Sequence, residues 1–289
     1  MDEPTSTTDP IEAPDPTSSS GHHRVRWVLV VVGAALLLGA AFVVGSFIFR
    51  DRPTERSVDD AVEAFRDSTS VVEPTSFAQP DPGVYEAVGA GGEEISAPPM
   101  QQADSDTMPV TVAPTQDGCW SWRIDYNSAH WHEYDFCPEG DGLILEGQRN
   151  SQSWDLGVDT ITNMSTTTCD PPAAILVAGA EPGDAELHRC TGVNTAAPGD
   201  SLAEGPSTMI GVETLVIGNE EVEAVHQRRT TTMTGAQRGT IDEDWWLEPT
   251  TGLPLRVDRD YDLRTDSVIG EIGYTESGSW QLASLVPRS

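Results

Sequence analysis

The sequence predicts a mainly β protein with one N-terminal transmembrane helix, followed by an antiparallel β-meander of half-barrel type that carries one short helix. Three observations predict this fold class. An uncharged apolar run fills residues 27–49, apolar residues recur at helical spacing just after residue 57, and from residue 83 onward apolar and polar residues alternate. Clusters of Gly, Pro, Asn and Asp separate the alternating runs, as turns between antiparallel strands require.

The apolar run Trp27–Phe49 sets the expected domain organisation. Its 23 residues suffice to cross a hydrocarbon core of about 30 Å as a helix. Residues 1–26 are rich in Pro, Ser, Thr and acid and predict a disordered cytosolic tail. Residues 50–82 predict a juxtamembrane helix and linker, and residues 83–289 an extracytoplasmic β domain. A cleaved signal peptide is the alternative, since Gly39–Ala41 offers small residues for cleavage.

The cysteines indicate which side of the membrane the β domain occupies, because arginines flank both ends of the apolar run. All four cysteines follow the run, as the close pairs Cys119 with Cys137 and Cys169 with Cys190. Such a set indicates two disulfides and an oxidising compartment, and four unrelated thiols are the alternative. We therefore expect a single-pass protein of the cell membrane with a cytoplasmic N-terminus and an extracytoplasmic C-terminal domain.

The charge restricts the class of partner. The formal net charge is -31, and all 16 basic residues are arginine. An acidic surface of this kind repels phosphate backbones and anionic lipid head groups, which argues against a nucleic-acid partner. The expected partners are the membrane, through the one span, and a lipid or a protein of the envelope.

A short amphipathic helix is predicted to begin after Ser57, which can cap its first turn, and to reach about Arg66. The residues at helical spacing are Val58, Ala61, Val62 and Phe65. Residues 67–82 contain three prolines and predict a linker. Gly89–Gly92 is followed by two acidic residues, which oppose phosphate binding, and predicts a turn.

The segment Cys119–Cys137 predicts a β-hairpin with a turn at residues 127–129. One register places Cys119 opposite Cys137 for a disulfide, Arg123 opposite Glu133 for an ion pair, and an aromatic ladder on the other face. That face should belong to the core. It consists of Trp120, Trp122, Ile124, Tyr126, His130, His132, Tyr134 and Phe136.

Further strands are predicted in chain order, ending in a meander. They cover residues 143–147, 154–158, 160–169, 213–217, 222–233, 240–248, 253–263, 268–276 and 280–286. Residues 171–208 are rich in Pro and Gly and predict an irregular connection, which Cys169 and Cys190 would attach to the sheet. On the strand at 253–263, Leu255, Val257, Arg259, Tyr261 and Leu263 share one face.

The pattern resembles the half-barrel proteins of bacterial envelopes, which include the LolA-like lipoprotein carriers and the RseB-like stress sensors. The resemblance is carried by the segments Ser57–Arg66, Glu213–Met233, Trp245–Leu247 and Thr251–Leu255. Gly83–Gly89 together with the Cys119–Cys137 segment is also similar to uncharacterised exported proteins of actinobacteria. The resemblance implies that the hollow of the sheet holds an acyl chain or a partner's peptide. It transfers no functional residue.

The sequence offers few candidates for chemistry. His130-x-His132 has the spacing of a metal site on one strand face, but no cysteine shares that face, and aromatic packing is the favoured interpretation. Asp258-x-Asp260-x-Asp262 lacks the glycine and glutamate of a calcium loop. Nucleophile and phosphate-loop motifs are missing from the sequence. We therefore predict no catalytic, cofactor-binding or metal residue, no cofactor, and no enzymatic activity.

The expected function is that of a membrane-anchored binding or sensing module of the bacterial cell envelope, which binds a lipid or a protein on a concave sheet face. Candidate residues for that face are Trp120, Trp122, Tyr134, Trp245 and Trp246. The alternative is that these side chains fill the core. Two other functions stay open: a passive scaffold or partner subunit of a cell-surface complex, which would show an exposed apolar patch, and a hydrolase.

Overall fold

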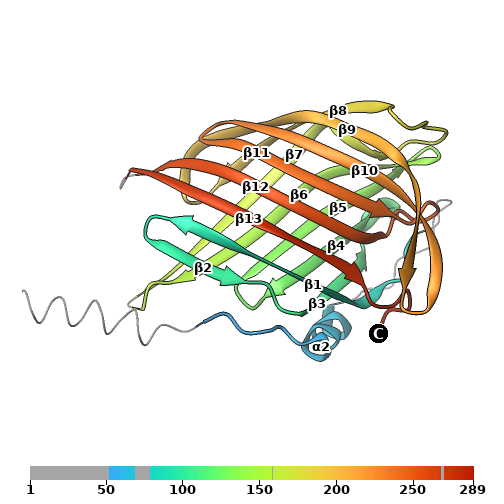
Figure 1. The fold of residues 1–289 in the computed structure, drawn as a ribbon, viewed down its shortest axis with the longest axis horizontal. Helices are drawn as coiled ribbons and strands as arrows, with labels where there is room; N and C mark the ends of the chain where they lie inside the picture. Colours follow the sequence, from blue (N-terminus) through green and yellow to red (C-terminus); the bar gives the residue numbers. More distant parts are fainter. Residues whose placement is uncertain (1–51, 69–78, 158, 268–269) are drawn as a thin grey trace, which may run out of the picture. The chain divides into compact units, whose positions relative to one another are not determined.

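The computed structural model describes residues 52–68, 79–157, 159–267 and 270–289. This part of the chain is mainly β and forms one 13-stranded antiparallel sheet that closes on itself (Figure 1). Neighbouring strands follow chain order from β3 to β13, and β1 lies between β3 and β13. The result is a closed 12-strand barrel, with the short strand β2 paired to the second half of β1.

The described elements have the following bounds. The helices are α2 (Val58–Ser68) and the 3-10 turn η1 (Gln116–Gly118). The strands are β1 (Gly83–Ser96), β2 (Pro99–Ala103), β3 (Thr107–Pro114), β4 (Trp120–Asn127), β5 (His130–Glu139), β6 (Gly142–Asp155), β7 (Thr160–Leu176), β8 (Ala185–Asn194), β9 (Ala197–Ile217), β10 (Glu220–Gly235), β11 (Gln237–Leu247), β12 (Pro254–Ser267) and β13 (Gly270–Leu282).

The antiparallel meander is confirmed, but the half-barrel prediction is wrong because the first and last strands pair. Residues 87–95 of β1 lie opposite residues 274–282 of β13. The segment Gly89–Gly92, predicted to be a turn, lies inside β1 at this junction. A Cβ atom added to Gly91 would lie 2.6 Å from the carbonyl oxygen of Ser277. Glycine therefore allows the two strand backbones to approach closely enough to close the barrel.

The membrane expectations require correction. The span predicted at Trp27–Phe49 and the tail at residues 1–26 lie outside the described residues. Among the residues that are described, no helix combines the length and the apolar character needed to cross a bilayer. The expectations of a transmembrane helix, of the membrane as an integral partner and of a single-pass localisation are corrected accordingly and are not carried further.

Helix α2 begins where the sequence predicts and extends two residues beyond Arg66, to Ser68. The Asp60 backbone N–H donates to Ser57 Oγ at 3.0 Å, which confirms the predicted cap. The apolar residues Val58, Ala61, Val62 and Phe65 are buried and pack with Val84 of β1. The helix thus covers the start of β1 on the outside of the barrel, and most of the predicted linker, residues 69–78, lies outside the described residues.

The predicted hairpin forms from β4 and β5 in the expected register, with Trp120 opposite Phe136 and Trp122 opposite Tyr134. Both disulfides, Cys119–Cys137 and Cys169–Cys190, are confirmed. Arg123 lies opposite Glu133, as predicted, but the direct ion pairs of these two side chains are with other residues. Arg123 instead binds Asp125 at 2.6 Å, and Glu133 binds Arg149 of β6 at 3.0 Å.

The irregular connection predicted for residues 171–208 is also wrong, since β7, β8 and β9 run through most of it. Several of the prolines and glycines lie within these strands, and Cys169 and Cys190 are opposite one another in the β7–β8 pair. In β8 the buried positions are His188, Cys190 and Gly192, whereas Leu187 and Val193 are exposed. This strand therefore lacks the alternation of apolar inward and polar outward residues by which strands are identified from sequence.

Candidate ligand-binding site in the barrel interior

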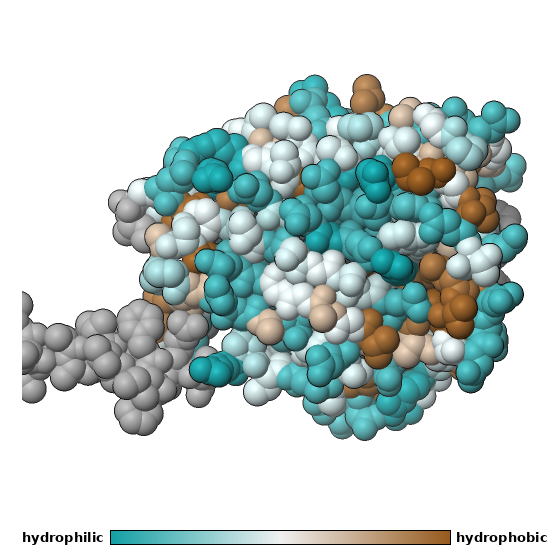
Figure 2. All heavy atoms as spheres, viewed as in Figure 1, coloured by the Kyte–Doolittle hydropathy of each residue, from teal (hydrophilic) through white to brown (hydrophobic). Residues whose placement is uncertain are grey.

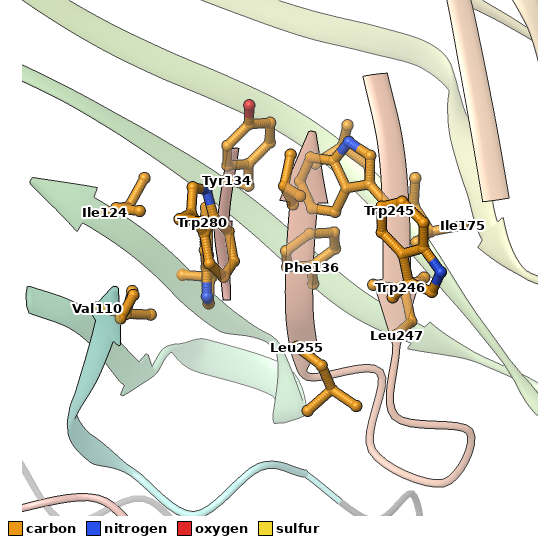
Figure 3. Close-up of a cluster of buried hydrophobic side chains, with 14 of the residues drawn as sticks. Val110, Ile124, Tyr134, Phe136, Ile175, Trp245, Trp246, Leu247, Leu255 and Trp280 are labelled. Carbon is orange, nitrogen blue, oxygen red and sulfur yellow. The ribbon is translucent and has the colours of Figure 1, made fainter. Parts of the chain in front are cut away.

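The barrel interior is apolar at one end. There, aromatic and aliphatic side chains pack together beside the starts of β4, β6 and β12 and the ends of β11 and β13 (Figure 3). The Trp122 ring centroid lies 5.2 Å from that of Trp280 and 6.0 Å from that of Trp245. We call this group the apolar plug. It includes Trp120, Trp122, Phe136, Leu143, Leu145, Trp245, Leu255 and Trp280.

The plug contains most of the predicted ligand face. Trp120, Trp122 and Trp245 are each at most 2% exposed and Tyr134 is 3% exposed. Trp246 is also buried, but its ring stacks on His226 at 4.2 Å and its indole N–H donates to Glu213 Oε2. The structure therefore puts these aromatic rings in packed surroundings, in keeping with the alternative that they fill the core.

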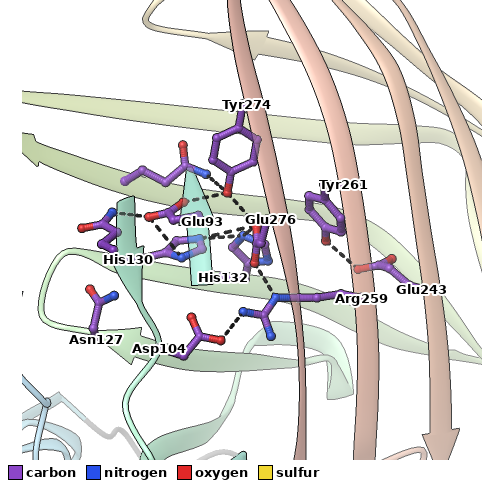
Figure 4. A network of polar contacts seen from close by, with 12 residues as sticks. Glu93, Asp104, Asn127, His130, His132, Glu243, Arg259, Tyr261, Tyr274 and Glu276 are labelled. Atoms are coloured by element: carbon purple, nitrogen blue, oxygen red, sulfur yellow. Dashed lines mark hydrogen bonds and ion pairs between the residues drawn. The ribbon is translucent and has the colours of Figure 1, made fainter. Parts of the chain in front are cut away.

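Beyond the plug lies a band of buried charged and polar side chains (Figure 4). Arg259 of β12 is at its centre. Its Nη2 donates to Asp104 Oδ2 at 2.6 Å, its Nε donates to Glu276 Oε1, and its guanidinium lies 3.8 Å from the centre of the Tyr126 ring. A guanidinium this deeply buried needs such partners to offset the loss of hydration.

Two carboxyl groups in the band share one hydroxyl. The Tyr274 oxygen lies 2.7 Å from Glu93 Oε2 and 2.6 Å from Glu276 Oε2, and it accepts a hydrogen bond from Gln152 Nε2. Burial, followed by the neighbouring Glu276, raises the pKa of Glu93 to about 8. For Glu276 burial acts in the same direction, but Arg259 and the two histidines outweigh it and lower the pKa to about 2. Glu93 therefore holds a proton at neutral pH while Glu276 is ionised.

Both residues of the His130-x-His132 motif belong to this band. They pack against aromatic rings, as favoured, with His130 4.8 Å from Tyr126 and His132 6.0 Å from Tyr261 between centroids. They also converge with Glu276 of β13, so that one donor atom from each of the three lies within 4.8 Å of the others. Burial lowers the pKa of His130 to about 3 and lowers that of His132 as well, so both rings are neutral at pH 7.

We did not predict Glu93, Arg259 or Glu276 as site residues from the sequence. One signal was present: Arg259 lies on the otherwise apolar face of its strand, between Val257 and Tyr261. A charged residue at an inward position of a strand indicates a buried partner, but alternation cannot say which strand supplies it.

An interior cavity of about 70 Å³ lies on the other side of the band. Its wall is rich in amide and hydroxyl groups: Gln148, Asn150, Gln152, Asn163, Ser165, Thr167, Asn194, Thr231 and Gln237. Arg229 and Glu243 also line it and pair with each other at 3.2 Å. Tyr261 donates to Glu243 at 2.7 Å, and Arg149, which also lines the cavity, pairs with Glu133 at 3.0 Å, so the charges at the cavity wall are already paired.

A second, apolar space of about 150 Å³, which we call the mouth pocket, lies next to the interior cavity. Its wall comes from the ends of β1, β6 and β12 and the starts of β7, β11 and β13. The apolar members are Ile95, Ala97, Pro98, Trp154, Leu156, Ile161, Ala196 and Ile272. The two spaces share Gln152, Asn163, Asn194, Gln237 and Tyr274 in their walls. Together they form an amphipathic site at the end of the barrel opposite the plug.

Comparisons with known proteins do not assign the chain to a family. No family model matches it, and no curated protein matches it. It is similar to the solved structure of the hypothetical lipoprotein YmcC from Escherichia coli (K12), with 11% sequence identity and a TM-score of 0.31 over 78% of this chain and 97% of that chain. A likeness of this size carries no argument about fold or function. The half-barrel part of the predicted resemblance is wrong because the sheet closes, and the resemblance to envelope proteins stays a prediction.

Proposed function

We propose that the protein is a binding module that holds a small amphipathic molecule, with the apolar part in the mouth pocket and an uncharged, hydrogen-bonding head group in the interior cavity. The observation that carries this proposal is that a polar space and an apolar space lie side by side and share five wall residues. Ligand sites are typically mostly apolar and contain a few convergent polar groups, which is the combination found here. We infer binding rather than catalysis, in keeping with the absence of a catalytic motif in the sequence.

The chemistry of the wall defines the head group. Amides and hydroxyls both donate and accept hydrogen bonds, so they suit hydroxyl-bearing groups such as sugars and polyols. The guanidinium of Arg229 is occupied by Glu243, and a charged head group would enter without a free counter-charge on this wall. The two disulfides favour an oxidising compartment such as the envelope, where glycolipids and related amphiphiles occur.

We place the ligand at the end of the barrel opposite the aromatic residues that were predicted to bind it. The scaffold alternative would be favoured by an extended exposed apolar patch. On the face seen in Figure 2, hydrophilic side chains predominate and hydrophobic ones form separate groups. We therefore prefer an internal ligand.

Short alkyl glycosides test the proposal directly. Octyl glucoside, below its micellar concentration, should bind the full-length protein in isothermal titration calorimetry with a negative heat-capacity change, because apolar surface is buried. Octyl sulfate has the same chain but a charged head, and glucose has the head without the chain; both should bind at least about tenfold more weakly. Equal binding of octyl glucoside and octyl sulfate would contradict the assignment of the head group.

Two matched variants locate the binding site. Ile161 lines the mouth pocket and is 48% exposed, while Leu187 lies on β8 away from the pocket and is 83% exposed. Ile161→Asp should weaken octyl glucoside binding at least about tenfold, because it introduces a carboxylate next to the alkyl chain. Leu187→Asp should leave binding unchanged. Equal binding by both variants would place the ligand elsewhere.

A further inference from the structure

We infer that His130, His132 and Glu276 form a binding site for one divalent transition-metal ion, of which Zn²⁺ is the representative. The sequence alone favoured aromatic packing for the two histidines, because it offered no third ligand on their strand face. Strand β13 supplies that ligand from the other side of the barrel interior (Figure 4). This inference is independent of the proposed amphipathic ligand.

The spacing of the donor atoms fits a transition metal. His130 Nε2 lies 3.1 Å from His132 Nε2, and the two nitrogens lie 3.9 Å and 3.8 Å from Glu276 Oε2. A point equidistant from three atoms with these separations is about 2.1 Å from each, which is within the range of Zn–N and Zn–O bonds in proteins. One ion can therefore reach all three atoms without a rearrangement of the backbone.

The second ring nitrogens of the two histidines, their Nδ1 atoms, have the oxygen neighbours that are usual for zinc-bound histidines. A metal-bound histidine usually directs its second ring nitrogen at a carboxylate or another oxygen, which fixes the tautomer. Here His130 Nδ1 is buried, has no hydrogen-bond partner, and lies 3.5 Å from Glu93 Oε1. His132 Nδ1 lies 3.5 Å from the Tyr134 hydroxyl oxygen. Both rings can therefore carry hydrogen on Nδ1 and present a bare Nε2 to the metal.

The charge of the surroundings also favours a cation. Once Arg229 is paired with Glu243, the carboxylates of Asp104 and Glu276 both bind the single guanidinium of Arg259 among the described side chains of the band. A divalent ion would compensate the remaining negative charge in a place where uncompensated charge is costly.

The donor set indicates which metal. Two imidazoles and one carboxylate suit Zn²⁺, Fe²⁺, Co²⁺ or Mn²⁺, whereas Ca²⁺ and Mg²⁺ prefer oxygen ligands. Three protein ligands leave at least one coordination position for water or another small molecule. His132, one of the three ligands, also lines the interior cavity, so the site borders a space that can hold water.

Metal stoichiometry tests the site. Full-length protein, purified without a metal column and stripped with a chelator, is exposed to Zn²⁺ in excess Ca²⁺, which occupies exposed acidic groups, and is then desalted. Mass spectrometry of the elements should find about one zinc per chain in the wild type. His132→Asn and Glu276→Gln should each retain at most about a tenth of that amount, as expected for loss of one of three ligands.

The control is His188→Asn, since His188 is equally buried in the barrel but binds Thr231 rather than the site. It should retain zinc like the wild type. Wild-type protein with less than about a tenth of a zinc per chain, or equal zinc in the wild type and in both ligand variants, would overturn the inference.

A second measurement does not depend on the folding of variants. Co²⁺ bound to the stripped wild-type protein should give the visible absorption of a four- or five-coordinate site, and one equivalent of Zn²⁺ should abolish it. The spectrum of six-coordinate aqueous Co²⁺ in the presence of the protein would also overturn the inference.

Discussion

Gly89 of β1 lies opposite Trp280 of β13, so closely that a Cβ atom at Gly89 would be 2.1 Å from the carbonyl oxygen of Ser279. The added atom would meet backbone rather than the end of a flexible side chain, so it could be accommodated only if the strands moved apart. We predict that Gly89→Ala lowers the free energy of unfolding by about 1–3 kcal/mol, as overpacking does elsewhere. Chemical denaturation followed by circular dichroism would measure this.

Gly211 of β9 provides the control, because a Cβ atom there would meet nothing within 4 Å. Gly211→Ala should leave stability unchanged or raise it by up to about 1 kcal/mol, since alanine restricts the unfolded chain more than glycine does. Equal losses in the two variants would show that the β1–β13 junction is not especially tight.

The hairpin and the barrel closure differ in how far the sequence could predict them. The β4–β5 register follows from residues within Cys119–Cys137, because the disulfide and the aromatic ladder require the same local pairing. Closure depends on β1 meeting β13, which are at opposite ends of the described domain. Alternation of side chains identifies strands but contains no information about how strongly the sheet curves. The same glycines that permit closure were therefore interpreted as a turn.

The candidate site was predicted only in part, for a related reason. His130 and His132 were identified because they share one strand face and a recognised spacing. Their third partner, Glu276, is ordinary in sequence, since the chain contains 47 acidic residues. Only the closed barrel brings β13 across from β5 and distinguishes this glutamate from the exposed ones. The mouth pocket likewise consists of residues from strand ends that are far apart in the chain.

The two carboxyl groups beside Tyr274 should respond differently to amide substitution. In Glu93→Gln the amide can accept from Gln102 and donate to the Tyr274 oxygen, as protonated Glu93 does. We expect a change of less than about 1 kcal/mol in the free energy of unfolding of chelator-treated protein at pH 7.

Glu276→Gln should instead cost about 3–5 kcal/mol in the same assay, because it removes a charged partner of the buried Arg259. Loss of the zinc site is excluded as the cause, since both proteins are metal-free when measured. Similar losses for the two variants would contradict the assignment of the proton to Glu93.

The two disulfides should contribute separately to stability. They close chain segments with sequence separations of 18 and 21 and join different strand pairs. The loop-entropy model gives about 3 kcal/mol for each. The double variant Cys169→Ala, Cys190→Ala should therefore lower the free energy of unfolding by about that amount, and the corresponding change at Cys119 and Cys137 should add to it. Strong non-additivity in denaturation experiments would show that the two strand pairs unfold as one coupled unit.

His188 should make the stability of the barrel depend on pH. Its Nε2 lies 2.9 Å from Thr231 Oγ1, and the side chain is 3% exposed. Burial, followed by the charge of Arg229, lowers the pKa of His188 from 6.5 to about 4. Between these two pH values the unfolded chain binds a proton that the folded protein does not, so this contribution is complete above pH 6.5 and is lost as the pH falls toward 4.

The substitution His188→Asn removes this proton difference and leaves the other titrating groups in place. Between pH 7.5 and pH 4 the wild type should therefore lose about 2–3 kcal/mol more of its free energy of unfolding than the variant does. Urea denaturation of both chelator-treated proteins at several pH values would measure the difference. The contributions of His130, His132 and the carboxyl groups are the same in both proteins and therefore cancel. Parallel pH profiles for the two proteins would mean that His188 can be protonated in the folded barrel, and that the cavity wall near Arg229 admits water.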